Sequence, residues 1–214
     1  MYKRQVVAKL QVYCSEDLGA FYLDVLKDRL YTSAPKSLAR RSAQTALHQI
    51  THALLRWLAP FLSFTAEEAW KIVGHSASIY TETYLPLAQP NQALLAKWGR
   101  LRELRAVVNK AIEDVRSTGG LGSSLQANLC LTLDAEDLAL LRSLGDELKF
   151  VFIVSAIELQ PGPALAVQVR ASSATKCARC WHWRDDVGHD PAHPELCGRC
   201  TSNLYGSGEV RRVA

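Results

Sequence analysis

The sequence lacks any hydrophobic run long enough to cross a membrane. Its richest apolar segment, residues 52–64, is interrupted by Arg56 and Pro60, whereas a membrane helix needs about 20 apolar residues in succession. The start of the chain is basic but has no apolar run behind it, so it predicts no signal peptide. Glycine and proline, 12 and 8 of 214 residues, are too few for collagen-like or low-complexity sequence. We therefore expect a folded, cytoplasmic chain with no membrane contact.

A strong net charge is also missing, since the formal value is only +4. The distribution of charge is more informative than the total. Residues 29–66 hold five arginines and lysines and no acidic residue, and residues 97–116 hold six basic residues against three acidic ones. Local positive excess of this kind suits a surface that faces nucleic-acid phosphates. A solvated helix face explains the same pattern, and charge alone does not separate the two interpretations.

The first half of the chain has the periodicity of α-helices. Apolar residues recur every three or four positions over residues 6–30, with a kink or restart expected near Ser15, and again over residues 37–58. Residues 75–93 have no period and predict a loop. A stripe with near-heptad spacing over residues 98–115 predicts a long helix that packs on the first ones or on a partner.

Local capping signals predict where two shorter helices begin and end. Thr65 and Glu68 have the spacing of a capping box, in which each side chain satisfies a free backbone N–H at the start of a helix. Gly74 is well placed to end that helix. Asp134 is expected to open a second short helix, which Gly145 closes.

The period changes after a glycine-rich turn. Residues 127–133 alternate as a half-buried strand does, and residues 150–154 and 165–169 predict two more strands. We therefore expect a mainly α protein, with a helical bundle followed by a small α/β unit and a cysteine-rich tail. The expected domains are residues 1–118, 119–171 and 172–214.

Four of the six cysteines are concentrated in the tail. Cys177 and Cys180 form one Cys-x-x-Cys pair, and Cys197 and Cys200 form another, with 16 residues between the pairs. Two such turns present four thiolates to one centre, which is the tetrahedral shell that zinc prefers. Four thiolates leave no open position for water, so the prediction is one structural Zn²⁺ in a knuckle or ribbon tail.

The cysteines also allow other interpretations. Disulfides or an iron–sulfur cluster are the alternatives to zinc. His182, His189 and His193 lie between the pairs and could replace a cysteine as ligand, although the symmetry of the pairs disfavours this. Cys14 and Cys130 have no partner in the sequence and fall on apolar stripes, so we expect them to be buried structural thiols.

Cations and aromatic residues surround the predicted metal site. This mixture suits contact with an RNA backbone and stacking on its bases, whereas tryptophans that merely cover the small metal core are the alternative. We find no Ser/His/Asp arrangement, no phosphate-binding glycine loop and no convincing carboxylate pair, so the residues favour a binding module over a catalyst. The candidate RNA contacts are Lys36, Arg40, Arg41, Lys176, Arg179, Trp181 and Arg199.

Several segments resemble a known family. The helical segments are similar to the anticodon-binding domain of class I aminoacyl-tRNA synthetases of the Ile/Val/Leu/Met group, and Phe-Tyr-Leu-Asp and Lys-Asp-Arg within them are most like bacterial isoleucyl-tRNA synthetases. The later segments resemble the small C-terminal α/β unit and terminal zinc domain of the same enzymes. Together they cover residues 6–214. In chain order they are residues 21–31, 39–47, 58–70, 122–127, 145–150, 176–182, 197–203 and 208–212.

The resemblance implies that this portion of the enzyme takes part in tRNA recognition. The whole enzymes charge isoleucine onto its tRNA with ATP. In them this portion would hold the anticodon stem-loop, whose unpaired bases can be read, and the zinc tail would brace the same end of the tRNA. Arg40 and Arg41 are the expected phosphate contacts. The implied partners are isoleucine tRNA and the catalytic half of the same enzyme, and we expect a monomer.

The sequence lacks the catalytic signatures and the editing domain of the family. It has neither the His-x-Gly-His-like signature nor the Lys-Met-Ser-Lys-Ser-like loop, since its only methionine is Met1, and the editing domain is absent. We therefore expect a non-catalytic C-terminal portion, with ATP bound only by the missing catalytic domain.

Two rival functions remain open. The first is a free-standing tRNA-binding accessory protein. The second is a DNA glycosylase of the formamidopyrimidine type, because those enzymes also end in a four-cysteine zinc finger. Their chemistry uses an N-terminal Pro-Glu, whereas Pro194 and Glu195 lie inside the metal loop of this sequence.

Overall fold

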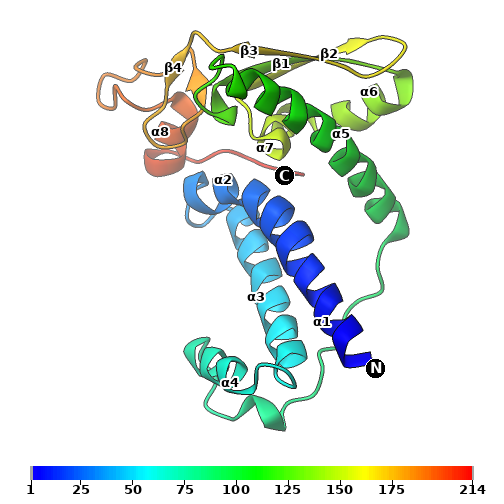
Figure 1. The fold of residues 1–214 in the computed structure, drawn as a ribbon. Helices are drawn as coiled ribbons and strands as arrows, with labels where there is room; N and C mark the ends of the chain where they lie inside the picture. Colours follow the sequence, from blue (N-terminus) through cyan, green and yellow to red (C-terminus); the bar gives the residue numbers. More distant parts are fainter. Residues whose placement is uncertain (1, 214) are drawn as a thin grey trace. The chain divides into compact units, whose positions relative to one another are not determined.

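Figure 1 shows the fold in a computed structural model, which describes the backbone of residues 2–213 and the side chains of residues 4–213. The described residues form two compact units. The larger unit comprises residues 2–40 and 92–213, and the smaller unit comprises residues 41–91. Among the described helices, none is both long and apolar enough to span a membrane.

The chain opens with one continuous helical stretch. It consists of α1 (Tyr2–Val12), the π-helical segment η1 (Tyr13–Leu23) and α2 (Asp24–Thr32). The helix predicted over residues 6–30 is confirmed, and the break expected near Ser15 falls within the wider π-helical turns. Those turns do not keep the three- and four-residue spacing of an α-helix. Cys14 is exposed, so the prediction that it is buried was wrong.

The next two helices are α3 (Leu38–Leu58) and α4 (Ser63–Ile72). The first confirms the helix predicted over residues 37–58. The capping box in the second was wrong, because α4 begins two residues before Thr65 and no side chain caps its N-terminus. Instead, the hydroxyl of Ser63 donates to the carbonyl oxygen of Ala59 at 3.1 Å, which ties the new helix to the preceding turn.

Gly74 ends α4 as predicted. Its φ of +101° lies in the left-handed region. Its N–H donates to the carbonyl oxygen of Lys71 at 3.1 Å, and the N–H of His75 donates to that of Trp70 at 3.4 Å. These two bonds satisfy carbonyls that the end of a helix leaves free. The core of the smaller unit is built around the fully buried Trp70 and includes Ala59, Ala66 and Ile79.

A loop and a long helix connect the two halves of the chain. The loop predicted over residues 75–93 contains one short 3-10 turn, η2 (Ile79–Thr81), before α5 begins. The long helix predicted over residues 98–115 is confirmed as α5 (Gln92–Ser117). Its buried residues follow the predicted stripe and are Leu101, Leu104, Arg105, Val108 and Ile112.

The larger unit also contains a three-stranded sheet with the order β2-β1-β3. The central strand β1 (Ala127–Leu133) follows the 3-10 turn η3 (Ser124–Gln126). It pairs in parallel with β2 (Ala156–Pro161) and antiparallel with β3 (Ala166–Ala171). Alternate residues of β1 are buried, as the sequence predicts, and Figure 1 shows the helices on one face of the sheet. Cys130 lies on the other face of β1 and is only half-buried.

The connection from β1 to β2 contains α6 (Ala135–Arg142), the turn η4 (Gly145–Glu147) and α7 (Leu148–Phe152). Asp134 caps α6 as predicted, since its carboxylate accepts from the N–H of Asp137 at 2.9 Å. The strand predicted over residues 150–154 was wrong, because most of that segment belongs to α7. Helix α7 ends at Phe152, and the next residue, Ile153, has a left-handed φ of 56°. Strand β2 begins three residues after Ile153.

One hydrophobic core holds the larger unit together. Leu101 of α5, Leu131 of β1, Leu141 of α6 and Val151 of α7 are all fully buried in it. A mainly helical protein with a small α/β unit is therefore the observed fold, as predicted. The domain boundaries after residues 118 and 171 stay a prediction about functional segments.

Candidate metal centre and nucleic-acid interface

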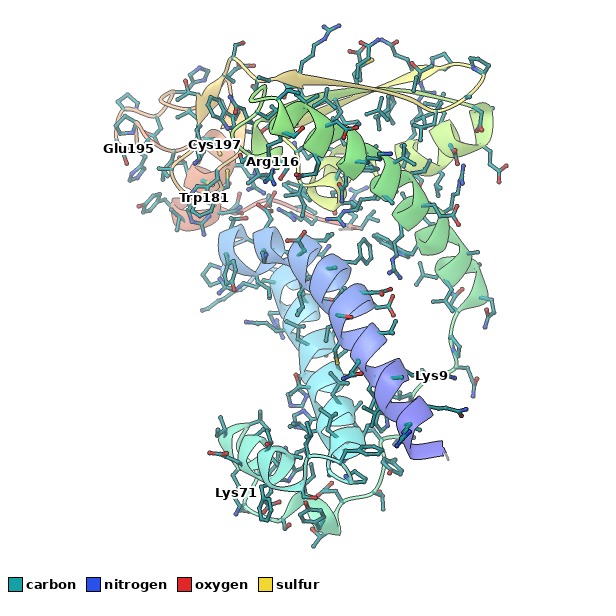
Figure 2. All side chains as sticks on the ribbon, in the orientation of Figure 1. Lys9, Lys71, Arg116, Trp181, Glu195 and Cys197 are labelled. Carbon is teal, nitrogen blue, oxygen red and sulfur yellow. The ribbon has the colours of Figure 1, made fainter. Side chains whose placement is uncertain are left out.

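Two short turns bring the four tail cysteines together. We call residues 177–180 the first knuckle and residues 197–200 the second knuckle. The first follows β4 (Thr175–Lys176), which pairs antiparallel with β5 (Trp183–Arg184), and the second begins α8 (Gly198–Tyr205). Figure 2 labels Cys197 at the start of α8 and Trp181 just after the first knuckle, at the same end of the larger unit.

The geometry of the four thiols fits a tetrahedral metal site. Their sulfur atoms all lie within 4.8 Å of one another and all four residues are buried. The sulfurs of Cys180 and Cys197 are 3.8 Å apart, which is about the edge of a tetrahedron with zinc–sulfur bonds of about 2.3 Å. In the structure all six cysteines are free thiols.

The electrostatics of the cluster also favour a cation. A hydrogen bond with Cys180 raises the pKa of Cys197 to about 11. A second hydrogen bond with Cys180 raises the pKa of the Cys200 thiol. The same bonds lower the pKa of Cys180. Ionisation of one thiol therefore opposes ionisation of its neighbours. A divalent metal removes that opposition, because it binds all four groups as thiolates. The donor set thus fits a structural Zn²⁺.

The three tail histidines lie outside this group of metal ligands. His182 is buried, and its Nδ1 lies 3.3 Å from the carbonyl oxygen of Cys180. The ring of His193 stacks on Tyr205 at 4.0 Å. Among the described residues, only the four cysteines form a cluster of three or more groups that could hold a metal ion, and His189 is no part of it.

Trp181 is the exposed tryptophan of this region. Its side chain is 58% exposed and its φ of 64° is left-handed, a conformation that strains a bulky residue. The Nζ atom of Lys176, itself exposed, lies 5.3 Å from the centre of the Trp181 ring. Trp183, by contrast, is half-buried. The interpretation of the tryptophans as a cover for the metal therefore suits Trp183 better than Trp181.

The remaining basic candidates lie in two different settings. Lys36 and Arg41 are exposed and Arg40 is half-buried around the start of α3. Arg179 and Arg199, in contrast, have partners within the larger unit. Arg179 donates to the carbonyl oxygens of α2, and Arg199 forms an ion pair with an α2 carboxylate. Their part in RNA binding stays a prediction, while these bonds give both an internal role.

Sequence reasoning did not find the partner of Arg199. Asp28 of α2 accepts from two nitrogens of the Arg199 guanidinium, both at 2.8 Å, and also from Arg211 near the end of the chain. Burial would raise the pKa of Asp28, but hydrogen bonds and charge from Arg199 and Arg211 together hold it well below its usual range. The two arginines also lie 4.9 and 3.7 Å from the ring centre of Phe150. No local pattern signals a pair 171 positions apart.

The chain matches two known domain families in order. Residues 2–131 match the anticodon-binding domain of tRNA ligases, and residues 175–203 match the zinc finger found in FPG and IleRS. The second match spans both knuckles.

Curated relatives extend the similarity over almost the whole chain. The chain is 57% identical to an isoleucine–tRNA ligase of Cupriavidus pinatubonensis over 98% of its length, and 56% identical to those of Bordetella petrii and Ralstonia pickettii over 97% and 98%. It spans 23% of the length of each of these relatives.

Proposed function

Since this chain belongs to the family of anticodon-binding domains of tRNA ligases, we propose that it recognises tRNA as the C-terminal portion of an isoleucine–tRNA ligase. One observation carries the proposal. An anticodon-binding region and a buried four-cysteine centre occur in a single chain that is 57% identical to an isoleucine–tRNA ligase. The substrate of the whole enzyme would be isoleucine, activated with ATP by a catalytic domain outside these 214 residues, and we propose the cytoplasm as its location.

We propose that one Zn²⁺ is bound by the four sulfur atoms of Cys177, Cys180, Cys197 and Cys200. The metal would supply folding energy to a segment whose small core consists largely of the cysteines themselves. With four sulfur ligands it has no free position for water or substrate, so its role would be structural.

The RNA contacts are proposed at the basic residues around the start of α3 and at the exposed Trp181. Lys36, Arg40 and Arg41 would neutralise phosphates of the anticodon stem-loop, and Trp181 beside Lys176 would offer a face on which a base can stack. The strained backbone of Trp181 supports a functional reason for holding this side chain outward. The chain would act as a monomer that binds tRNA together with the catalytic half of the enzyme.

Binding measurements test this function directly. The purified chain is titrated with isoleucine tRNA, a non-cognate tRNA and duplex DNA of matched length, each at two salt concentrations. The double variant Arg40→Gln with Arg41→Gln should weaken tRNA binding and flatten its salt dependence, because each lost phosphate contact lowers the slope by about 0.7 to 0.9. Arg142→Gln with Arg170→Gln is the control with the same change of charge, because both side chains are exposed and lie outside the two basic segments.

Three outcomes separate the candidate functions. Preference for isoleucine tRNA supports the proposal. Equal binding to both tRNAs, still sensitive to the Arg40 and Arg41 variants, supports a general tRNA-binding accessory protein. Preference for duplex DNA would instead favour the DNA glycosylase function, because the matched zinc-finger family is also found in FPG.

A further inference from the structure

The two knuckles place equivalent arginines against the same helix. Arg179 is the third residue of Cys177–Cys180, and Arg199 is the third residue of Cys197–Cys200. Both side chains contact α2. The two contacts differ in kind, since one is with the backbone of the helix and the other with a side chain.

Arg179 caps the C-terminus of α2. Its Nη1 donates to the carbonyl oxygen of Thr32 at 2.6 Å, and its Nη2 donates to that of Tyr31 at 3.1 Å. The last carbonyls of a helix have no partner within it and carry partial negative charge, so a guanidinium there satisfies both requirements.

Arg199 holds the same helix one turn earlier. Its guanidinium and the carboxylate of Asp28 form two parallel hydrogen bonds, and the side chains are only 8% and 14% exposed. Glu209 and Arg211 complete the group, and Asn203 of α8 fixes Glu209 through two hydrogen bonds. Buried paired charges depend strongly on geometry, because a displaced partner leaves the other charge unpaired.

We infer that the metal centre acts as a clamp on α2, with Arg179 and Arg199 as its two positioning residues. Each arginine directly precedes a proposed metal ligand, so ligation of Cys180 and Cys200 fixes the backbone from which its side chain extends. Metal binding and docking of α2 would therefore favour each other, and this coupling is reciprocal by thermodynamic necessity.

The clamp has a consequence for the residues that follow α2. Thr32 is the last residue of α2, and the chain reaches Lys36, Arg40 and Arg41 within nine residues. The clamp would thus set the position from which this basic segment starts. That consequence rests on the proposed tRNA-binding function, whereas the coupling between metal and α2 rests only on the proposed zinc ligands.

The rate of zinc release to a chromophoric chelator tests the coupling. In the zinc-loaded 214-residue chain, Asp28→Asn and Arg179→Gln should each speed release at least about fivefold. Asp24→Asn is the matched control, because Asp24 also lies on α2 but its carboxylate pairs with Lys27 and with Arg105 of α5. Asp28→Glu should recover most of the slow release. Release that is unchanged in Asp28→Asn, or equally fast in Asp24→Asn, would overturn the inference.

A second measurement needs no substitution. Hydrogen exchange of the α2 amides is followed in the zinc-loaded chain and after chelation, with α5 as internal reference. Faster exchange in α2 but not in α5 is expected, and equal exchange in α2 before and after chelation contradicts the clamp. The absorption of the cobalt-loaded variants checks that each still forms a tetrahedral thiolate site.

RNA binding of the same variants separates the two proposals. If zinc release and exchange respond as expected but neither Asp28→Asn nor the Arg40 and Arg41 variant alters tRNA affinity, the clamp stands and the proposed function fails. If the Arg40 and Arg41 variant weakens tRNA binding but zinc release is insensitive to Asp28, the proposed function stands and the clamp fails.

Discussion

The Nε2 atoms of His52 and His75 lie 2.8 Å apart, so the two imidazoles share a hydrogen bond within the smaller unit. Nδ1 of His52 faces the carbonyl oxygen of His48 at 2.8 Å. A carbonyl only accepts, so this nitrogen carries the proton, and Nε2 of the neutral ring accepts from His75. The His75 ring also stacks on Trp70 with the centroids 3.7 Å apart. The turn after α4 is thereby fastened to α3.

Replacement of His75 should loosen the smaller unit. His75→Ala leaves the buried His52 nitrogen without a donor, which should lower the free energy of unfolding of this unit by about 1–3 kcal/mol. Hydrogen exchange of the α3 and α4 amides measures the change. His189→Ala, an exposed histidine of the metal loop, is the control. Equal protection in both variants would show that the histidine pair contributes nothing.

The core of the larger unit should respond to the loss of one leucine. Leu101 of α5 is fully buried, whereas Leu95 of the same helix is 56% exposed. Leu101→Ala is expected to cost about 2–5 kcal/mol through lost burial and a cavity, and Leu95→Ala should stay within about 0.5 kcal/mol of the unmodified chain. Urea denaturation monitored by circular dichroism compares the two, and similar midpoints would contradict the packing described for α5.

The tail should depend on metal for its fold. Metal analysis of the purified chain is expected to find one zinc per chain, and Cys197→Ser should abolish tight binding while Cys130→Ser retains it. Chelation should disorder the knuckles but spare the sheet, because the core around β1 lies in a separate cluster of buried residues. Amide NMR spectra with and without chelator distinguish these regions. Loss of the β1 signals on chelation would argue against a metal role confined to the tail.

A carboxylate of α4 should titrate below its ordinary range. The N–H of Ile79 donates to Glu67 at 2.8 Å, and this bond, with help from Ser78 and Lys71, outweighs partial burial and lowers the pKa of Glu67. A group with a lowered folded-state pKa contributes stability above its ordinary value, near 4.3, and that stability is lost as pH falls through the folded-state value.

NMR of the Ile79 amide tests this carboxylate directly. Its chemical shift should change with pH, with a midpoint below the ordinary glutamate value. Glu67→Gln should remove the transition, and Glu68→Gln, on the exposed neighbour, should preserve it. A midpoint at or above the ordinary value would mean that the hydrogen bond to Ile79 does not favour the carboxylate.

Sequence reasoning succeeded where the signal is local. The apolar stripe in α5 and the alternation of buried residues in β1 are periodic over many residues. The two Cys-x-x-Cys spacings predict that the four thiols lie close together, as they do in the structure. Residues 150–154 show the limit of this approach. An unbroken apolar run fits a buried helix as well as a buried strand, whereas the true strand, β2, has the weaker alternation of Ile157 and Leu159 with polar residues.

Contacts between distant residues left no such signal. Arg179 and Arg199 are basic residues beside a metal site, a pattern that suits RNA contact as well as an internal ion pair. The choice depends on whether α2 lies against the knuckles, which is a property of the tertiary fold. The same holds for Cys14, which lies on an apolar stripe of the sequence but in a helical segment that has no buried residue.

The pairing of Asp28 with residues near the other end of the chain sets an order of events during synthesis. Its partners Arg199 and Arg211 lie 171 and 183 positions later. At about 5–20 residues per second a ribosome needs roughly 10–35 s to add the first of them. Until both arginines have been made the Asp28 carboxylate has neither of these partners, and α2 can form the contact only after that point.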